Sequence, residues 1–322
     1  MASGNPHGRH GARPGRHAAR PGRHRGKRRA IGGTQTAAVA LVALTGVGLA
    51  VHGARREEPV AAPAKTNAAD TAGQQTRHTT DAASRARPVA MRVGRVSVES
   101  DGFLSWALLD RRTGWITGSA NFAAPSDTMS MVKAWLAADY LRQHPKPTRA
   151  ARQQLRIMIR DSDNAAAQAI YREVGRTESI ERMIETCRLT DSAAVPGMWS
   201  NTVVSARDVV RLGLCLADGR AAGPVWTDWL LNEMREVRGT GDFGVRTALD
   251  DDTVAIKNGW LLRDEDGLWH VSCLAIADRW VISVLARYPG GEGLETGADL
   301  CREVGAQLLG IANPVVAAVA RG

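Results

Sequence analysis

The hydrophobic pattern predicts β-strands at the beginning and at the end of the region that follows residue 91. Residues 103–110, FLSWALLD, are followed by a turn-forming RRTG at 111–114 and by a second apolar stretch at 115–121. This order is typical of a β-hairpin. Near the C-terminal end, three stretches rich in Val, Ile and Trp predict an antiparallel meander, and they lie at 253–260, 268–277 and 280–288.

Between these strands the apolar residues follow a helical period. A first helix is expected after Asp127 or Thr128, either of which can cap it. Further helical runs are expected at 165–174, at 206–216 and, as a closing helix, at 300–308. Strands at both ends with helices between them predict an α+β fold. Its antiparallel sheet is built from both ends of the domain and covered by helices, and an all-helical lobe completes it.

Most of the net positive charge of the chain lies in its first 29 residues. The formal net charge is +9, and residues 1–29 contain nine basic and no acidic residues, which leaves 33 of each sign in the remainder. A neutral remainder argues against binding of nucleic acid by the folded part, because phosphate binding requires clustered positive charge. The tail repeats the pattern GRHGARP with variations. Its Gly, Pro and charge predict disorder, and no metal site is expected in it.

Residues 30–51 are predicted to enter a membrane, because they contain no charged residue and follow the basic tail. A retained transmembrane helix would leave the tail cytoplasmic and place the domain at 91–322 outside the cell, after an extracytoplasmic linker at 52–90. A cleaved signal peptide, with cleavage near Ala50, is the alternative and would give a secreted protein. Retention of the segment in the cell membrane is the favoured interpretation.

The four cysteines, Cys187, Cys215, Cys273 and Cys301, all follow the predicted membrane segment. An oxidising compartment and an even number of cysteines permit disulfides. Pairing of Cys187 with Cys215 and of Cys273 with Cys301 is preferred, since both pairs have the same separation of 28 residues. Four buried free thiols remain an equal alternative on sequence grounds.

Ser130-Met131-Val132-Lys133 is the only S-x-x-K motif in the chain. Residues three apart share one helical face, so Lys133 is placed to accept the proton of the Ser130 hydroxyl. An isolated match of this kind has little specificity, because a surface Ser and a solvated Lys give the same pattern.

Two further motifs follow in the chain. Ser162-Asp163-Asn164 lies between two helical runs, where a hydroxyl and an amide can relay a proton and hold a substrate amide. The same residues also suit a polar turn with Ser162 or Asp163 as a helix N-cap. Lys257-Asn258-Gly259 lies on the first strand of the meander. There Lys supplies positive charge and Gly permits close backbone approach, although alone the motif is only an edge lysine.

Together, the three motifs resemble the S-x-x-K, S-D-N and K-T-G signature of class A β-lactamases and penicillin-binding proteins, in the same order and context. The resemblance implies an exported, monomeric serine hydrolase that needs no cofactor or metal and acts on a small molecule or a peptidoglycan-like substrate. It implies these roles: Ser130 as nucleophile, Lys133 as base, Ser162 as proton relay, Lys257 as electrostatic partner, and Asn164, Asn258, Gly259 and Trp260 as substrate contacts. The N–H groups of Ser130 and Trp260 would form the oxyanion hole.

Two departures from this signature bear on activity. Asn258 stands where the family has Thr or Ser, which removes a hydroxyl that grips the substrate carboxylate. Residues 187–202 contain no Glu to activate a deacylating water, and Asp191 is their only acid. The sequence therefore predicts acyl transfer to Ser130 from an amide or ester, with slow deacylation. The alternative is a catalytically degenerate relative that binds a ligand or partner in the cell envelope.

Overall fold

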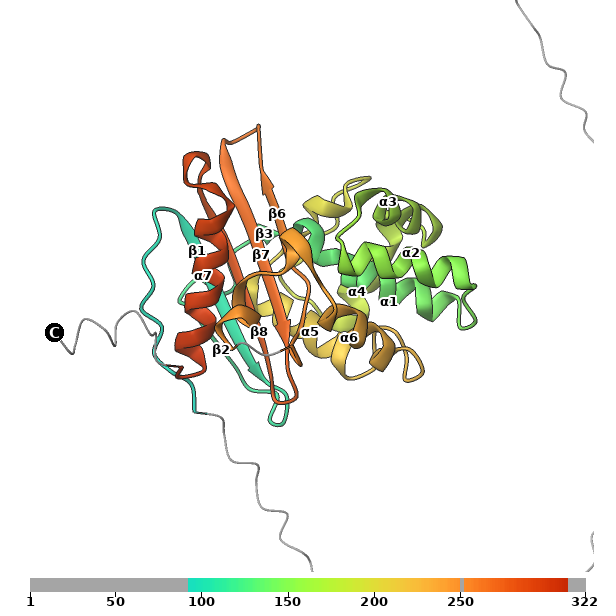
Figure 1. The fold of residues 1–322 in the computed structure, drawn as a ribbon, viewed down its shortest axis with the longest axis horizontal. Helices are drawn as coiled ribbons and strands as arrows, with labels where there is room; N and C mark the ends of the chain where they lie inside the picture. The colour runs from blue at the N-terminus through green and yellow to red at the C-terminus, as the bar shows by residue number, and fades with distance from the viewer. Residues whose placement is uncertain (1–91, 250–251, 312–322) are drawn as a thin grey trace, which may run out of the picture. The chain divides into compact units, whose positions relative to one another are not determined.

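In a computed structural model of the protein, residues 92–249 and 252–311 are described, and they form an α+β domain (Figure 1). Within these residues the main sheet has six antiparallel strands: β1 (Phe103–Asp110), β2 (Ile116–Gly118), β5 (Ala255–Ile256), β6 (Gly259–Leu262), β7 (Leu268–Ile276) and β8 (Trp280–Pro289). Their order is β2-β1-β8-β7-β5, and β6 also pairs with β7. The first strand thus lies beside the last one, which confirms a sheet made from both ends of the domain.

Helices cover both faces of this sheet. They are α1 (Lys133–Gln143), α2 (Arg149–Arg160), α3 (Asn164–Glu173), α4 (Thr177–Cys187), α5 (Ala206–Ala217), α6 (Thr227–Arg235) and α7 (Gly293–Leu308). Successive side chains of a strand point to opposite faces. On β7, Val271 and Cys273 face α7, whereas Leu274 and Ile276 face α5. The remaining helices gather on one side of the sheet as the predicted helical lobe (Figure 1).

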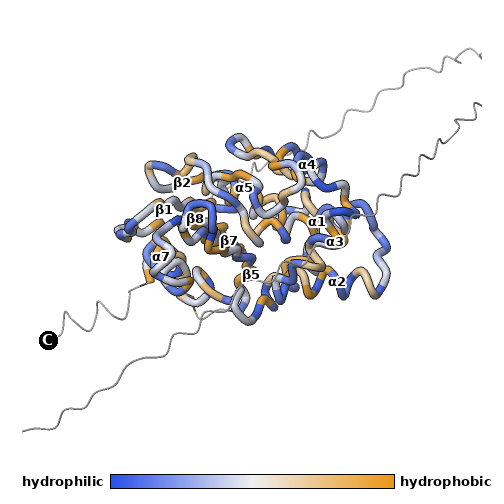
Figure 2. The backbone as a smooth tube through the Cα atoms, turned by 90° about the horizontal axis from the view of Figure 1, so that it is seen from above, coloured by the Kyte–Doolittle hydropathy of each residue, from blue (hydrophilic) through white to orange (hydrophobic). Residues whose placement is uncertain are grey.

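Helix α1 forms the centre of this lobe, and residues 133–141 are all buried. The indole of Trp135 donates a hydrogen bond to the Ser179 carbonyl oxygen at 2.8 Å, and Asp139 accepts from Ser179 Oγ and from Arg182, both at 2.6 Å. These bonds fix α1 against α4, because a buried carboxylate and indole both need their partners. The surrounding helices alternate between hydrophilic and hydrophobic positions, as expected for helices with one buried face (Figure 2).

The short elements surround the start of α1. Strand β3 (Ser126–Asp127) pairs with β4 (Val203–Val204), and 3₁₀ turns follow as η1 (Met129–Val132), η2 (Trp199–Asn201), η3 (Gly239–Gly241), η4 (Gly244–Ala248) and η5 (Gly290–Glu292). The helix expected after Asp127 or Thr128 therefore begins as a 3₁₀ turn, and Thr128 makes no side-chain cap. Asp163 does cap α3, where it accepts from the Ala166 amide at 2.6 Å.

The first strand of the predicted meander is interrupted in the structure. It forms two short strands, β5 and β6, and the break falls at Lys257 and Asn258. Both side chains are buried. Lys257 donates to Ser162 of the helical lobe, and Asn258 donates to the segment at 241–243. The break therefore coincides with the motif that the sequence assigned to this strand.

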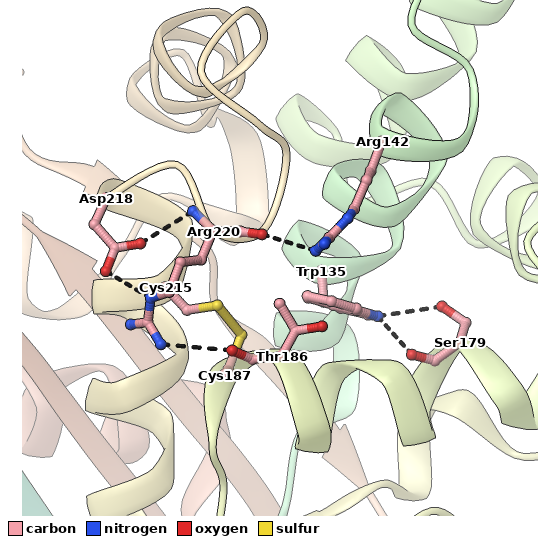
Figure 3. Close-up of a disulfide and its surroundings, with 8 residues drawn as sticks. All are labelled: Trp135, Arg142, Ser179, Thr186, Cys187, Cys215, Asp218 and Arg220. Atoms are coloured by element: carbon pink, nitrogen blue, oxygen red, sulfur yellow. Dashed lines mark hydrogen bonds and ion pairs between the residues drawn. A yellow bond between two sulfur atoms is a disulfide. The ribbon is translucent and has the colours of Figure 1, made fainter. Parts of the chain in front are cut away.

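The preferred cysteine pairing is confirmed. Cys187 pairs with Cys215 and joins the end of α4 to α5, and Cys273 pairs with Cys301 and joins β7 to α7. Figure 3 shows the first disulfide beside Arg220, whose guanidinium donates to the Thr186 carbonyl oxygen at the end of α4. Each disulfide therefore connects elements that pack together in the core, and the alternative of four free thiols is excluded.

Removal of the Cys273–Cys301 disulfide is expected to lower the free energy of unfolding. Closing a loop across a separation of 28 residues restricts the unfolded chain by about 3–4 kcal/mol. The double variant Cys273→Ala/Cys301→Ala should lose that amount in urea unfolding. The variant Cys187→Ala/Cys215→Ala should lose a similar amount, because its disulfide also spans a separation of 28 residues. A loss below about 1 kcal/mol would contradict the loop-entropy explanation.

The predicted tail, membrane segment and linker at 1–29, 30–51 and 52–90 lie outside the described residues. Among the helices that the structure does describe, none has the length and apolar character needed to cross a membrane.

Candidate active site

A cleft of about 610 Å³ lies between the helical lobe and strand β6. Four of the residues predicted from the motifs line it: Ser130, Ser162, Asn164 and Trp260. Lys133 and Lys257 are fully buried immediately behind this surface. The fold therefore brings together side chains that come from three distant parts of the chain.

The backbone at the cleft is strained at two positions. Met129, directly before Ser130, has φ 46°, and Ser162 has φ 56°. A non-glycine residue in this left-handed region costs roughly 1–2 kcal/mol, and such strain clusters at functional sites. In both cases the unusual backbone lies at or next to a hydroxyl that faces the cleft.

Gly259 allows strand β6 to lie directly against the segment that carries Ser130. A Cβ atom at this position would lie 2.5 Å from the Ser130 amide nitrogen and 2.6 Å from the Thr128 carbonyl oxygen. Both neighbours are backbone atoms, which cannot move aside as a flexible side chain can. The close approach predicted for this glycine is therefore to the backbone of the candidate nucleophile.

Lys133 is held by the second motif. Its Nζ donates to the Ser162 carbonyl oxygen at 2.5 Å, to Asn164 Oδ1 at 2.7 Å and to Ser162 Oγ at 3.3 Å. Burial lowers the pKa of Lys133 to about 8, against a smaller raising effect of the Asp163 carboxylate. A neutral amine, which a proton-accepting role needs, is therefore accessible near physiological pH.

Lys257 approaches the same hydroxyl from the sheet. Its Nζ donates to Ser162 Oγ at 3.1 Å and to the Asn258 carbonyl oxygen at 2.9 Å. Burial and the positive charge of Lys133 lower the pKa of Lys257 well below its ordinary value. Ser162 Oγ thus connects two buried amines that repel each other when both are charged, which favours a single shared positive charge.

The structure corrects the role expected for Asn258. Its side chain is buried, and its amide donates to the carbonyl oxygens of Gly241 at 3.1 Å and Phe243 at 2.8 Å. It does not line the cleft. Asn258 therefore holds the wall at 241–243 in place, because an amide can reach two carbonyl oxygens whereas a threonine hydroxyl donates to only one.

Asp191, the only acid in the segment that lacks Glu, is committed to other partners. It accepts from Arg207 NH2 at 2.6 Å and from Ser205 Oγ at 2.7 Å. The Arg207 hydrogen bond, with that of Ser205, holds the pKa of Asp191 below its ordinary value. Since Asp191 does not line the cleft, it is poorly placed to activate a deacylating water.

Trp199 covers Lys133 from the same segment. The Nζ atom lies 5.2 Å from the centroid of the indole ring, and the indole nitrogen donates to Gln168 Oε1 at 3.1 Å. A cation near the face of an indole is stabilised by the ring quadrupole. An aromatic ring therefore shields the amine of Lys133 on the side of segment 187–202. Sequence reasoning missed this residue, since a Trp in a loop carries no catalytic signal.

Asp161 and Arg238 were also missed. Both line the cleft, and the carboxylate accepts from Arg238 Nε at 2.6 Å and from NH2 at 3.1 Å. The hydrogen bond from Arg238 lowers the pKa of Asp161. Asp161 directly precedes the S-D-N motif, which was the available signal. Arg238 precedes Gly239-Thr240-Gly241, but no sequence pattern linked that segment to the motifs.

The TLA-3 extended-spectrum β-lactamase superposes with a TM-score of 0.57 and 14% identity, over 66% of this chain and 95% of that one. A β-lactamase from Chitinophaga pinensis superposes with a TM-score of 0.56 and 19% identity, over 66% and 95% of the two chains. At these identities the likeness concerns the fold, which is that of class A β-lactamases.

Residues 128–311 match the Beta-lactamase enzyme family, and the chain belongs to it. Putative lipoprotein LppW of Mycobacterium tuberculosis is 28% identical over 181 residues, which is 52% of this chain and 57% of that protein. The LppW protein of Mycobacterium bovis matches to the same extent. The match thus spans a little more than half of these relatives.

Proposed function

We propose that the protein is an extracytoplasmic serine hydrolase in which an amide or ester substrate acylates Ser130, and in which the acyl group is released slowly. The observation that carries the proposal is the convergence of two buried lysines on Ser162 Oγ, at 3.1 and 3.3 Å. A structural role does not require two amines to be buried together, because burial of even one positive charge is costly. Perturbed pKa values in a cleft are typical of catalytic sites.

In the proposed acylation step, Ser130 Oγ attacks the substrate carbonyl carbon. Its proton passes to the neutral amine of Lys133, directly or through the Ser162 hydroxyl, and then to the leaving nitrogen or oxygen as the scissile bond breaks. The amide groups of Ser130 and Trp260 would stabilise the oxyanion, and one such donor contributes roughly 3 kcal/mol. Lys257 would keep positive charge near the developing negative charge.

Deacylation has less support from the residues around the cleft. Asp161 is the only carboxylate lining the cleft in the described part of the chain, and Arg238 neutralises it. Asp191 is paired with Arg207, and Trp199 covers Lys133. Because hydrolysis of the acyl group needs a positioned water and a base, the acylated protein should persist.

The cleft suits an extended substrate with an apolar portion. Strand β6 pairs only with β7 among the described strands, so its outer edge offers backbone donors and acceptors to a substrate. Leu261 and Leu262 are exposed by 46% and 41% on this strand. A small peptide or a peptidoglycan-like amide would combine backbone pairing with these apolar contacts. Asn164 and Trp260 are the proposed side-chain contacts of the substrate.

An extracytoplasmic location is part of the proposal. We propose a cytoplasmic tail at 1–29, a membrane segment at 30–51, retained or cleaved, a linker at 52–90 and a monomeric catalytic domain at 91–322. Two disulfides support an oxidising compartment. The description of LppW as a putative lipoprotein also fits association with the cell envelope.

Intact-mass measurement tests the proposal. The purified protein is incubated with a fluorophosphonate, with an activated ester and with a panel of β-lactams. We expect a stoichiometric adduct on Ser130 with at least one of them and very slow hydrolysis of ordinary penicillins, because acylation and deacylation depend on different groups. Peptide mapping locates the adduct.

Two results would contradict the proposal. Rapid turnover of a penicillin would show that a deacylating base exists. Absence of an adduct with every reagent, in protein whose circular dichroism is that of a folded α+β domain, would instead favour a protein that binds an envelope ligand without turnover.

A further inference from the structure

A buried cluster of ionisable side chains that the proposed mechanism does not use lies beside strand β6, where His270 is the cross-strand neighbour of Leu261. His270 lies on β7, and its side chain is only 5% exposed. Its Nδ1 lies 2.9 Å from Asp127 Oδ2, and its Nε2 lies 2.8 Å from Asp266 Oδ2. Arg263 completes the cluster by donating to Asp127 Oδ2 at 2.7 Å.

The protonation state of His270 follows from this geometry. A neutral imidazole has one N–H and one lone pair, so it can donate to only one of the two carboxylates. The other carboxylate would then face a lone pair. Doubly protonated His270 donates to Asp127 and to Asp266 at once, and with Arg263 it balances both negative charges. The arrangement is therefore complete only with the imidazolium form.

The cluster joins three segments that build the cleft. Asp127 ends strand β3, three residues before Ser130, and its carbonyl oxygen accepts from Ser272 Oγ of β7 at 2.8 Å. Asp266 belongs to the turn that follows β6, the strand that packs on Ser130. Arg263 NH2 also lies 3.2 Å from Asn201 Oδ1, in the same 3₁₀ turn as Trp199.

We infer that His270 is a positioning residue for Ser130. Its doubly protonated ring ties the strand before the nucleophile to the β6–β7 hairpin, and loss of one proton weakens this tie to the contacts that Arg263 and Ser272 make with Asp127. The inference rests on the proposed acylation of Ser130, and it adds a residue that no part of the S-x-x-K, S-D-N and K-T-G signature contains.

The electrostatic surroundings fix the direction of the pH effect. Burial alone would lower the pKa of His270, but the hydrogen bonds and charges of Asp127 and Asp266 outweigh it, so the pKa is raised above its ordinary value. Arg287, the cross-strand neighbour on β8, stacks its guanidinium over Phe103 at 4.3 Å. A raised pKa stabilises the fold fully below about pH 6.5, and this contribution is lost as pH rises through the folded-state value.

The rate constant for modification of Ser130 by a fluorophosphonate, measured from about pH 6 to 9, tests the inference. Loss of the Lys133 proton gives the neutral base, so the wild-type rate should rise with pH. Loss of the His270 proton should oppose that rise. His270→Gln should lack this opposing decrease of the rate at higher pH. At neutral pH it should react about tenfold more slowly than the wild type, since small displacements of a nucleophile are costly. Asp266→Asn should move the decrease to lower pH, because one carboxylate no longer holds the proton.

His144→Gln provides a matched control. His144 also faces a carboxylate, that of Glu173 at 3.9 Å, but it does not line the cleft. Its profile should coincide with that of the wild type. An opposing decrease that is unchanged in either His270→Gln or Asp266→Asn would overturn the inference. Asp266 is 40% exposed, so Asp266→Asn carries the test even if His270→Gln fails to fold.

Hydrogen exchange separates this inference from the proposed function. In the wild type, peptides covering 259–270 should exchange faster at alkaline pH than the intrinsic chemical rate predicts, and in Asp266→Asn this increase should begin at lower pH. This readout needs no reaction at Ser130. If no reagent acylates Ser130 but the exchange pattern is as expected, the proposed function alone is refuted. If the protection of 259–270 in the wild type does not depend on pH, the positioning role is refuted.

Discussion

Ser130→Ala should abolish the covalent adduct, and Lys133→Met should slow its formation by about a thousandfold. Ala removes the oxygen that forms the bond, and Met removes the base while retaining most of the volume of a fully buried side chain. Intact mass over time gives both results. Lys146→Met is the control, because Lys146 is the only exposed lysine among the described residues.

The pH dependence of the same reaction identifies the base. If the pKa of Lys133 is about 8, the acylation rate constant of His270→Gln, which lacks the opposing effect of the His270 proton, should rise about tenfold per pH unit below that value and level off above it, since only the neutral amine accepts the proton. Persistence of this limb in Lys133→Met would show that another group is the base.

Gly259→Ala should lower the acylation rate constant at least a hundredfold while the protein remains folded. The added methyl group meets the Ser130 amide nitrogen at 2.5 Å and the Thr128 carbonyl oxygen at 2.6 Å, so β6 or the nucleophile must move by a large fraction of an ångström. Displacements of this size in a reacting group cost about two orders of magnitude. The fluorophosphonate rate and circular dichroism measure the two effects.

Gly291→Ala is the matched control for this substitution. No atom lies within 4 Å of a Cβ at that position, and its backbone is not left-handed. It should react at the wild-type rate. An unchanged rate in Gly259→Ala would mean that the contact between β6 and Ser130 is not required in the reactive state.

The predicted fold depended on patterns that are local in the chain. The hairpin pattern at 103–121 identified β1, and the stretches rich in Val, Ile and Trp at 268–277 and 280–288 identified β7 and β8, whose residues are almost all buried. The break between β5 and β6 could not be predicted, since it arises from Lys257 and Asn258 turning toward other segments. Tertiary contacts of this kind leave no periodic signal.

The candidate site likewise contains residues that local sequence motifs identified and residues that only the fold brings near. The three motifs identified Ser130, Ser162 and Lys257, and the fold places them around one cleft or directly behind it. The role of Asn258 was misjudged, because a motif position gives the residue type but not the direction of its side chain. Trp199 and Arg238 reach the candidate site only through the fold of the chain, so no sequence motif could identify them.

The buried amine of Lys133 also lowers the free energy of unfolding of the domain. A pKa of about 8 in the folded state, against about 10.4 in the unfolded chain, corresponds to about 3 kcal/mol of destabilisation at neutral pH. This cost is absent above the unfolded-state value and is complete below about pH 8. Since a whole domain is stable by only about 5–15 kcal/mol, an inactive variant with Met at this position should tolerate more heat than the native protein. If Lys133 is the base of the proposed acylation, the domain gives up heat tolerance for that reaction.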